Sequence, residues 1–143
     1  MMSRFDYDLF TIGGGSGGVR ASRMSSGFGA RVGAVEDRHW GGTCVNIGCV
    51  PKKLMVFASE VGAEIHEAGG YGWSIGAQPK FDWRALIDNK NKEIKRLQAI
   101  YQRIMGDAGV DTFDGRGRIV APHTVEIAEA GGGTRTVTAE RIL

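Results

Sequence analysis

Apolar and turn-forming residues alternate over the first 36 positions in the order strand, helix, strand. Residues 6–12 read DYDLFTI, a short apolar run typical of a buried strand. Residues 30–36 read ARVGAVE, a second such run that ends at Glu36, although Gly33 weakens it. The stretch between the runs has the length of one helix and stops at a glycine-rich turn over residues 27–29. The pattern predicts a βαβ unit.

A long helix and a group of strands follow. Residues 81–108 place apolar side chains at helical spacing opposite a charged face, and Gly109 closes the pattern. These apolar positions are Trp83, Leu86, Ile87, Ile94, Leu97, Tyr101, Ile104 and Met105. Residues 111–143 read as short strands around a Gly-Gly-Gly turn. The chain is therefore predicted to be an α/β protein that ends in a β segment.

The composition fits one globular domain. The 143 residues are 42% hydrophobic and 24% charged, and the net charge of +2 is too small to indicate a nucleic-acid or membrane partner. No apolar run approaches the ~20 residues that span a bilayer, and MMSRFDYDLF lacks the features of a secretory signal. A cytoplasmic location is expected. Thiols there are normally reduced, so two nearby cysteines favour catalysis or metal binding over a structural disulfide.

A glycine loop joins the first predicted strand to the helix after it. Gly13, Gly15 and Gly18 satisfy the G-x-G-x-x-G pattern in the strand, loop and helix context that dinucleotide binding requires. Glu36 lies 23 residues after Gly13, where a carboxylate would bind an adenosine ribose. An ordinary surface turn is the alternative. The pattern predicts a site for FAD or NAD, and the carboxylate disfavours the 2′-phosphate of NADP.

Both cysteines, Cys44 and Cys49, lie in the segment GGTCVNIGCVPKK. On an ideal helix their spacing exceeds the ~7 Å Cα separation that a disulfide allows, so pairing needs a distorted turn, for which Gly48 and Pro51 are candidates. Closing so small a loop would add little stability. Inert buried thiols and a metal site are alternatives, although histidines at suitable spacing are lacking. The positive charge of Lys52 favours a redox-active pair.

Three segments together resemble a known family. DYDLFTIGGGSGG, VGAVE and GGTCVNIGCVPKKLM are similar to the N-terminal FAD domain of the pyridine nucleotide-disulfide oxidoreductases. The ending Pro-Lys-Lys resembles the glutathione and trypanothione reductases of that family, whereas lipoamide dehydrogenases and mercuric reductases usually have Pro-Ser-Lys. The resemblance implies a Rossmann-like FAD-binding domain with an inserted helical hairpin, whose first helix lies near 41–68 and whose second lies near 81–108.

The resemblance also implies that these residues are the N-terminal portion of a longer enzyme. Family members add an NADPH domain, an interface domain that builds a homodimer, and a C-terminal acid–base histidine, and no segment here matches them. The expected activity is FAD-dependent reduction of glutathione disulfide by NADPH, and the isolated chain is expected to be inactive. Another disulfide reductase of the family, or a stand-alone FAD-binding or thiol-switch module, is the alternative.

The family's site residues carry over position by position. The resemblance implies that Cys44 attacks the substrate disulfide, that Cys49 lies nearest the flavin, and that Lys52 neighbours the flavin ring. The implied FAD contacts are Gly13, Gly15, Ser16, Gly17, Gly18, Glu36, Gly42, Thr43, Cys44, Lys52 and Gly117.

Substrate choice is implied by the helix after the glycine loop. Arg23 falls where glutathione reductases carry an arginine that meets glutathione carboxylates, and Arg20 lies one turn earlier. Trypanothione reductases place glutamate and tryptophan at these two positions, which suits a cationic substrate. Tyr101 matches a tyrosine that gates the disulfide site, and Ser16 is a further implied substrate contact. The two arginines therefore favour anionic glutathione disulfide.

Overall fold

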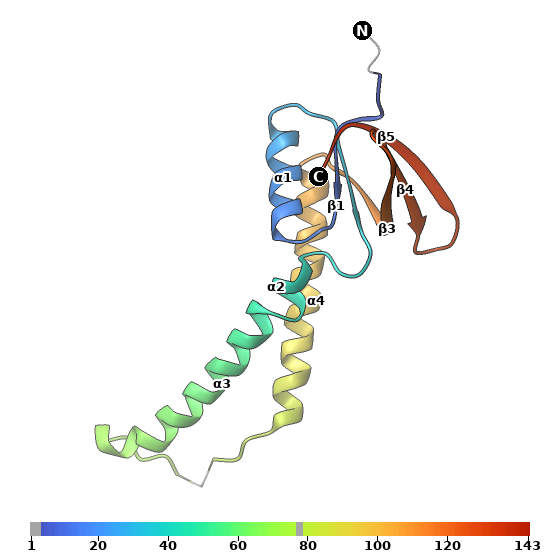
Figure 1. Cartoon of the computed structure of the whole chain (residues 1–143). Coiled ribbons are helices and arrows are strands. Elements are labelled where there is room, and N and C mark those ends of the chain that lie inside the picture. Colours follow the sequence, from blue (N-terminus) through green and yellow to red (C-terminus); the bar gives the residue numbers. More distant parts are fainter. Residues whose placement is uncertain (1–3, 77–78) are drawn as a thin grey trace.

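The computed structural model describes residues 4–76 and 79–143, and its first elements form the predicted βαβ unit (Figure 1). Strand β1 (Tyr7–Ile12) leads through the glycine loop into helix α1 (Ser16–Gly27), which is followed by strand β2 (Val32–Glu36). The two strands pair in parallel. The element order predicted for this part of the chain is confirmed.

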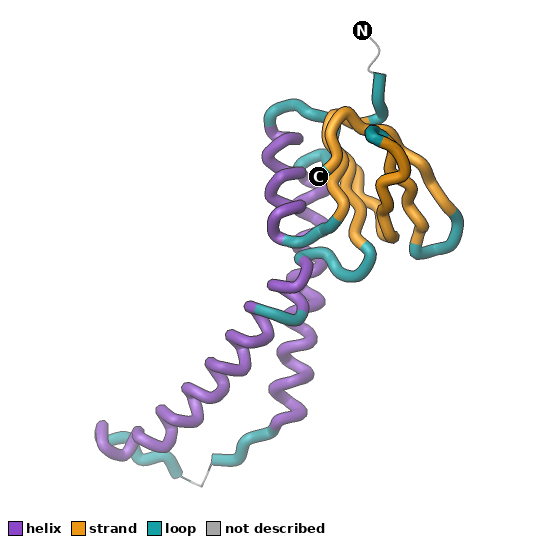
Figure 2. The backbone as a smooth tube through the Cα atoms, viewed as in Figure 1, coloured by secondary structure: helices purple, strands orange, loops and turns teal. Residues whose placement is uncertain are grey.

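Five strands close into a ring, which the sequence pattern does not reveal (Figure 2). Strand β3 (Asp111–Ala121) first pairs in parallel with β2 and then antiparallel with β4 (Thr124–Glu129). Strand β5 (Thr134–Ile142) pairs antiparallel with β4 and then parallel with β1. β3 changes partner at Gly115, where a Cβ would lie 2.4 Å from the carbonyl oxygen of Ala128. The close crossing of the two strands therefore requires glycine.

The predicted helical insertion lies between β2 and β3. Its elements are α2 (Gly42–Asn46), α3 (Cys49–Glu67), a short 3-10 helix η1 (Ala68–Tyr71) and α4 (Trp83–Asp107). The prediction of one helix near 41–68 is wrong in one respect, because two residues separate α2 from α3. At this break a Cβ on Gly48 would lie 2.9 Å from the carbonyl oxygen of Thr43. The chain thus turns sharply between the two cysteines.

The side chains of β2 contribute to two separate cores. Val35 packs inside the strand ring with Phe10, Val125, Ile127, Val137 and Ala139. Val32 and Ala34 pack on the other side of the strand with Val19 of α1, Met105 of α4, Trp40 and Val110. Gly33 was expected to weaken β2, but a Cβ there would lie 2.6 Å from Cδ2 of Phe10. The ring of Phe10 fills the space that glycine leaves.

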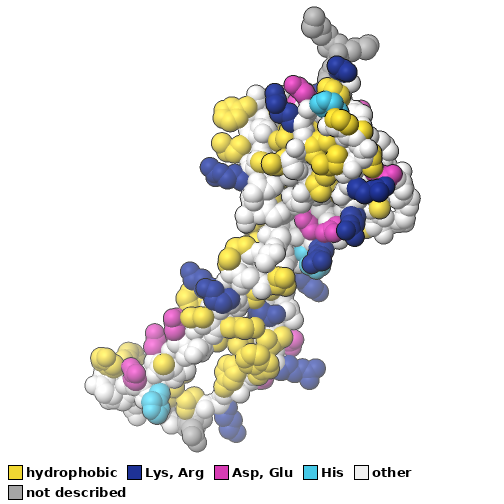
Figure 3. Space-filling model, viewed as in Figure 1, with side chains coloured by type: hydrophobic (Ala, Val, Ile, Leu, Met, Phe, Trp, Pro, Cys, Tyr) yellow, Lys and Arg dark blue, Asp and Glu magenta, His cyan; other side chains and the backbone are white. Residues whose placement is uncertain are grey.

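The hairpin of α3 and α4 extends away from the strands (Figure 1), and apolar side chains gather along it (Figure 3). Its exposed large apolar residues are Met55, Val56, Phe57, Val61, Tyr71, Trp73, Ile75, Phe81 and Trp83. Within residues 4–76 and 79–143, none of the helices combines the length and the apolar character that crossing a membrane requires.

Helix α4 begins with a side-chain cap. Asp82 precedes the helix, and its Oδ1 accepts a hydrogen bond from the amide of Ala85 at 3.1 Å. Replacement of an N-cap aspartate by alanine costs about 1 kcal/mol. We expect Asp82→Ala to lower the free energy of unfolding by about that amount in urea titrations. Asp88→Ala, an exposed change on the same helix, is the control and is expected to have a smaller effect.

Candidate nucleotide and disulfide site

The glycine loop has the geometry of a phosphate-binding turn. Gly13 has φ +116°, a left-handed value that favours glycine. A Cβ on Gly18 would lie 1.9 Å from the carbonyl oxygen of Gly13, so only glycine lets α1 approach the loop this closely. Gly15 caps α1 without a side-chain hydrogen bond, and the first turn holds no acidic residue. The first amide N–H groups of α1 are therefore available to an anion.

Glu36 is held at the end of β2 by backbone amides. Its Oε2 accepts from the amide of Gly14 at 2.7 Å, and its Oε1 accepts from the amides of Arg38 at 2.9 Å and His39 at 3.1 Å. Each carboxylate oxygen has about two lone-pair positions, so Oε2 keeps one acceptor position for a ligand hydroxyl. The structure therefore places Glu36 as a fixed acceptor beside the glycine loop.

The indole of Trp40 packs against the glycine loop. The sequence analysis did not single out this residue. Its side chain is 3% exposed, and its Nε1 donates to Oδ1 of Asp114 at 2.9 Å. A Cβ on Gly14 would lie 2.5 Å from Cε3 of the indole. Gly14 is thus required by packing, while the G-x-G-x-x-G pattern leaves that position open. The arrangement ties the loop to β3.

The glycine loop and the cysteine segment touch each other. The amide of Gly41 donates to the carbonyl oxygen of Gly14 at 2.8 Å. Gly42 has φ +60°, and a Cβ there would lie 2.7 Å from Cα of Gly15. A cleft of about 530 Å³ runs along this contact, lined by Gly15, Glu36, Asp37, Arg38, His39, Gly42, Thr43, Asn46 and Ile47. The glycine loop and the segment that carries the cysteines therefore border one cleft.

The two cysteines are free thiols that contact each other across the helix break. Cys44 lies in α2 and is half-buried, and Cys49 is the exposed first residue of α3. The hydrogen bond between the thiols raises the pKa of Cys44, and desolvation and the charge of a Cys49 thiolate act in the same direction. In the described part of the chain, no three His, Cys, Asp or Glu residues gather where they could hold a metal ion.

Lys52 lies on the first turn of α3, beside an apolar groove. The groove has a volume of about 430 Å³ and is lined by Ile47, Gly48, Pro51, Lys52, Met55, Val56 and Ser59. Lys52 is exposed, and its amide donates to the carbonyl oxygen of Gly48 at 3.1 Å. Lys53, in contrast, places its Nζ 5.3 Å from the ring centroid of Phe57. The cation that borders this groove is thus Lys52.

A pocket between α1 and α4 brings together the predicted substrate residues. Its volume is about 260 Å³, and its lining is Ser16, Val19, Arg20, Arg23, Met24, Tyr101 and Ile104. Both arginines are exposed, and Tyr101 is half-buried. The lining does not include Cys44 or Cys49, although the resemblance implies that Tyr101 gates the disulfide site. Positive charge, a hydroxyl group and an aromatic ring thus meet at one place.

Gly117 lies at a second opening beside the glycine loop. This pocket of about 230 Å³ is lined by Ile12, Gly13, Val35, Asp37, Gly115, Arg116 and Gly117. A Cβ on Gly117 would lie 2.6 Å from Cγ1 of Val35. Glycine at this position leaves room for the side chain of Val35. The backbone of Gly117 therefore borders the same end of the sheet as the glycine loop.

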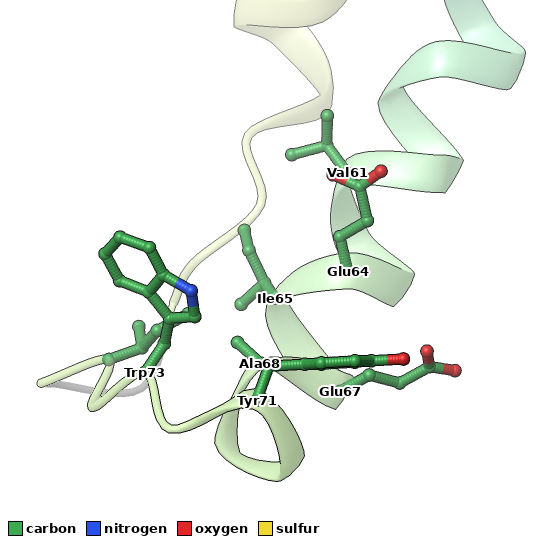
Figure 4. A pocket seen from close by; sticks show the side chains of 8 residues that line it. Val61, Glu64, Ile65, Glu67, Ala68, Tyr71 and Trp73 are labelled. Atoms are coloured by element: carbon green, nitrogen blue, oxygen red, sulfur yellow. The ribbon is translucent and has the colours of Figure 1, made fainter.

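Another pocket lies at the far tip of the hairpin (Figure 4). Its volume is about 480 Å³, and its lining is Val61, Glu64, Ile65, Glu67, Ala68, Tyr71, Trp73 and Ile75. Figure 4 shows the ring of Trp73 standing beside the end of α3. None of the residues predicted for the site lines this pocket. It lies at the end of the hairpin away from the glycine loop (Figure 1).

Comparison with known proteins decides the family. Residues 7–143 match the sequence profile of the pyridine nucleotide-disulphide oxidoreductases. The chain belongs to this family. The family resemblance and the Rossmann-like α/β fold predicted from the sequence are confirmed.

Individual relatives agree with the family assignment. The chain is 49% identical over 134 residues to a chloroplastic/mitochondrial glutathione reductase of Pisum sativum, which covers 87% of the chain and 24% of the relative. It is 46% identical to a glutathione reductase of Burkholderia cepacia, over 95% of the chain and 30% of the relative. It is 36% identical to thioredoxin reductase SEP1 of Emiliania huxleyi, over 96% and 29%. The chain thus spans 24% to 30% of the length of these relatives.

The sequence analysis found site residues in the glycine loop and the cysteine segment. The structure adds three residues that the sequence analysis did not single out. Gly14, Trp40 and Asn46 hold the site together but carry no motif position. An indole next to the Gly-Gly-Thr-Cys segment is a sequence signal that could have pointed to Trp40. The hydrogen bond between Asn46 and Gln98 joins positions 52 residues apart, and no local pattern indicates it.

Proposed function

We propose that these residues form the FAD-binding and disulfide-bearing portion of an enzyme that reduces glutathione disulfide with NADPH. The observation that carries this proposal is the pocket where Arg20, Arg23 and Tyr101 meet beside the glycine loop. Glutathione disulfide carries several carboxylates, and guanidinium groups bind carboxylates well. The glutathione reductases among the relatives support the same conclusion.

The residues around the glycine loop fit FAD. The N-terminal amides of α1 would hold the pyrophosphate, and Glu36 would accept a ribose hydroxyl at its remaining lone pair. Gly13, Thr43 and Gly117, which line the clefts beside the loop, would add contacts, as would Ser16 and Gly17 at the start of α1. Lys52 would lie beside the flavin ring. When bound, FAD would supply the redox chemistry that carries an electron pair from NADPH to the cysteine disulfide.

The reduced cysteines would then carry out thiol–disulfide exchange. Cys44, as a thiolate, attacks one sulfur of glutathione disulfide, which forms a mixed disulfide and releases one glutathione thiolate that takes up a proton. Cys49 attacks the sulfur of Cys44, releases the second glutathione, and closes the Cys44–Cys49 disulfide.

The proposed reaction also needs features that these residues do not supply. We propose that the NADPH site, the acid–base histidine and the homodimer interface are supplied by further segments of the enzyme. A cytoplasmic location also stays a prediction, since the relative from Pisum sativum is named as chloroplastic/mitochondrial. Visible absorption of the enzyme that carries these residues tests the cofactor directly: a bound flavin that NADPH reduces supports the proposal. A flavin that NADPH does not reduce in that whole enzyme would favour a thiol-switch module.

Charge reversal at Arg23 tests the substrate. In the enzyme that carries these residues, Arg23→Glu is expected to raise KM for glutathione disulfide by at least about tenfold, a loss of about 1.4 kcal/mol in binding. FAD content and kcat are expected to change little, because the side chain lies in the pocket between α1 and α4. Steady-state kinetics with NADPH measures both constants.

Arg84→Glu is the matched control for this experiment. Arg84 is an exposed arginine at the start of α4, away from the pocket, so the same change in charge is expected to leave KM unaltered. An unchanged KM in Arg23→Glu would contradict glutathione disulfide as the substrate. Activity on a protein disulfide instead would favour a function like the one in the name of the thioredoxin reductase relative.

A further inference from the structure

Asn46 lies between the two cysteines, and its side chain is surrounded by backbone carbonyl groups. Its Nδ2 donates to the carbonyl oxygen of Gly42 at 2.8 Å and to that of Trp40 at 3.3 Å, with the carbonyl oxygen of His39 at 3.4 Å. Carbonyl oxygens can only accept, so the amide nitrogen must face them. The side chain thereby fixes the segment that leads into Cys44.

The other end of the same side chain is bound to α4. Nε2 of Gln98 donates to Oδ1 of Asn46 at 2.6 Å. Both side chains are half-buried, and Gln98 lies one helical turn before Tyr101. Asn46 therefore connects the cysteine turn, the segment next to the glycine loop and the helix that carries the substrate-pocket tyrosine.

The shortness of α2 explains why the cysteine turn needs these hydrogen bonds. α2 has only 5 residues, and the chain breaks its helical path before Cys49. A helix this short is not stable by itself, so its end needs an external tie. The hydrogen bonds of Asn46 supply that tie within the loop that a disulfide would close.

We propose that Asn46, held by Gln98, is a positioning residue that keeps Cys44 and Cys49 within bonding reach and so favours closure of their disulfide. The inference rests on the proposed function, in which this pair cycles between dithiol and disulfide. Oxidation by glutathione disulfide removes two electrons and two protons from the pair, forms one S–S bond, and breaks the S–S bond of the oxidant to give two glutathione thiols. Asn46 makes and breaks no bond in this reaction.

The equilibrium between dithiol and disulfide measures the effect. The FAD-loaded protein is equilibrated with mixtures of reduced and oxidised glutathione, the free thiols are blocked with a maleimide, and the oxidised fraction is measured by mass spectrometry. Asn46→Ala is expected to lower the equilibrium constant for closure by about tenfold, equivalent to a reduction potential about 30 mV higher. A more mobile turn lowers the effective concentration of one thiol at the other, which is the reason for this direction.

Gln98 provides a second and gentler variant. Gln98→Ala is expected to shift the equilibrium in the same direction by about threefold, because Asn46 keeps its carbonyl contacts. The double variant is expected to match Asn46→Ala, since the two residues act through one hydrogen bond. Gln102→Ala is the matched control: it removes an exposed glutamine on the same helix and is expected to leave the equilibrium unchanged.

The outcomes separate this inference from the proposed function. If the unaltered protein closes its disulfide and both variants match it at equal FAD content and equal circular dichroism, the positioning role is wrong and the proposed function stands. If the unaltered protein forms no Cys44–Cys49 disulfide in any glutathione mixture, both are wrong. Should Asn46→Ala fail to fold, Gln98→Ala decides the question by itself, because Asn46 keeps its hydrogen bonds to backbone carbonyls in that variant.

Discussion

Replacement of either cysteine by serine is expected to lower the reduction of glutathione disulfide by at least about a thousandfold in the enzyme that carries these residues. The expectation follows from the exchange chemistry, in which Cys44 must attack the substrate and Cys49 must release the product. A serine hydroxyl in place of either sulfur leaves no second thiol to close the disulfide. Turnover with NADPH and glutathione disulfide measures the loss.

The two variants differ in one property that turnover does not show. Cys44→Ser keeps the thiol that we place nearest the flavin, so the anaerobically reduced enzyme is expected to keep a long-wavelength absorption band from thiolate and flavin in contact. Cys49→Ser is expected to lack that band while it retains FAD. Each variant removes one sulfur, so each serves as the control for the other. The reverse pattern would exchange the roles of the two cysteines, and a turnover loss below tenfold would contradict the redox role itself.

The βαβ unit and α4 can be predicted from the sequence because the residues that indicate each element lie close together in the chain. The glycine loop lies within a few residues of both the strand and the helix that it joins, and the apolar stripe of α4 repeats over 25 residues. Closure of the strand ring depends instead on β3 and β5, each of which pairs with two different strands. No local pattern reports a change of partner, although Gly115 marks it once the structure is known.

In the candidate site too, some residues can be placed from local spacing and others cannot. Spacing alone places Gly13, Gly15, Gly18 and Glu36 together, because the βαβ unit fixes their positions. Family resemblance, and not spacing, pairs Arg23 with Tyr101, which lie on different helices and line one pocket. Backbone atoms make the contacts that join the glycine loop to the cysteine segment. The only sign of these contacts in the sequence is therefore a glycine at each position where the two segments meet. The functional roles of these residues stay predictions.

Gly18 is the position where one added methyl group is expected to have the largest effect on the fold. A Cβ there would lie 1.9 Å from the carbonyl oxygen of Gly13 and 2.9 Å from Cγ2 of Thr11. The carbonyl is a backbone atom and cannot rotate away, so α1 must move off β1. Overpacking of this kind costs about 3 kcal/mol, and we expect Gly18→Ala to lower the free energy of unfolding by about that amount. Chemical denaturation followed by circular dichroism measures it.

The same displacement is expected to weaken FAD binding, because the amides of α1 would no longer point at the pyrophosphate position. We expect the dissociation constant for FAD to rise at least about tenfold, equivalent to about 1.4 kcal/mol. Gly27→Ala is the control on the same helix: a Cβ there has no neighbour within 4 Å, so stability and FAD affinity are expected to be unchanged or slightly increased. If Gly18→Ala behaves like Gly27→Ala in both measurements, the close approach of α1 to the glycine loop is not what holds the nucleotide site in shape.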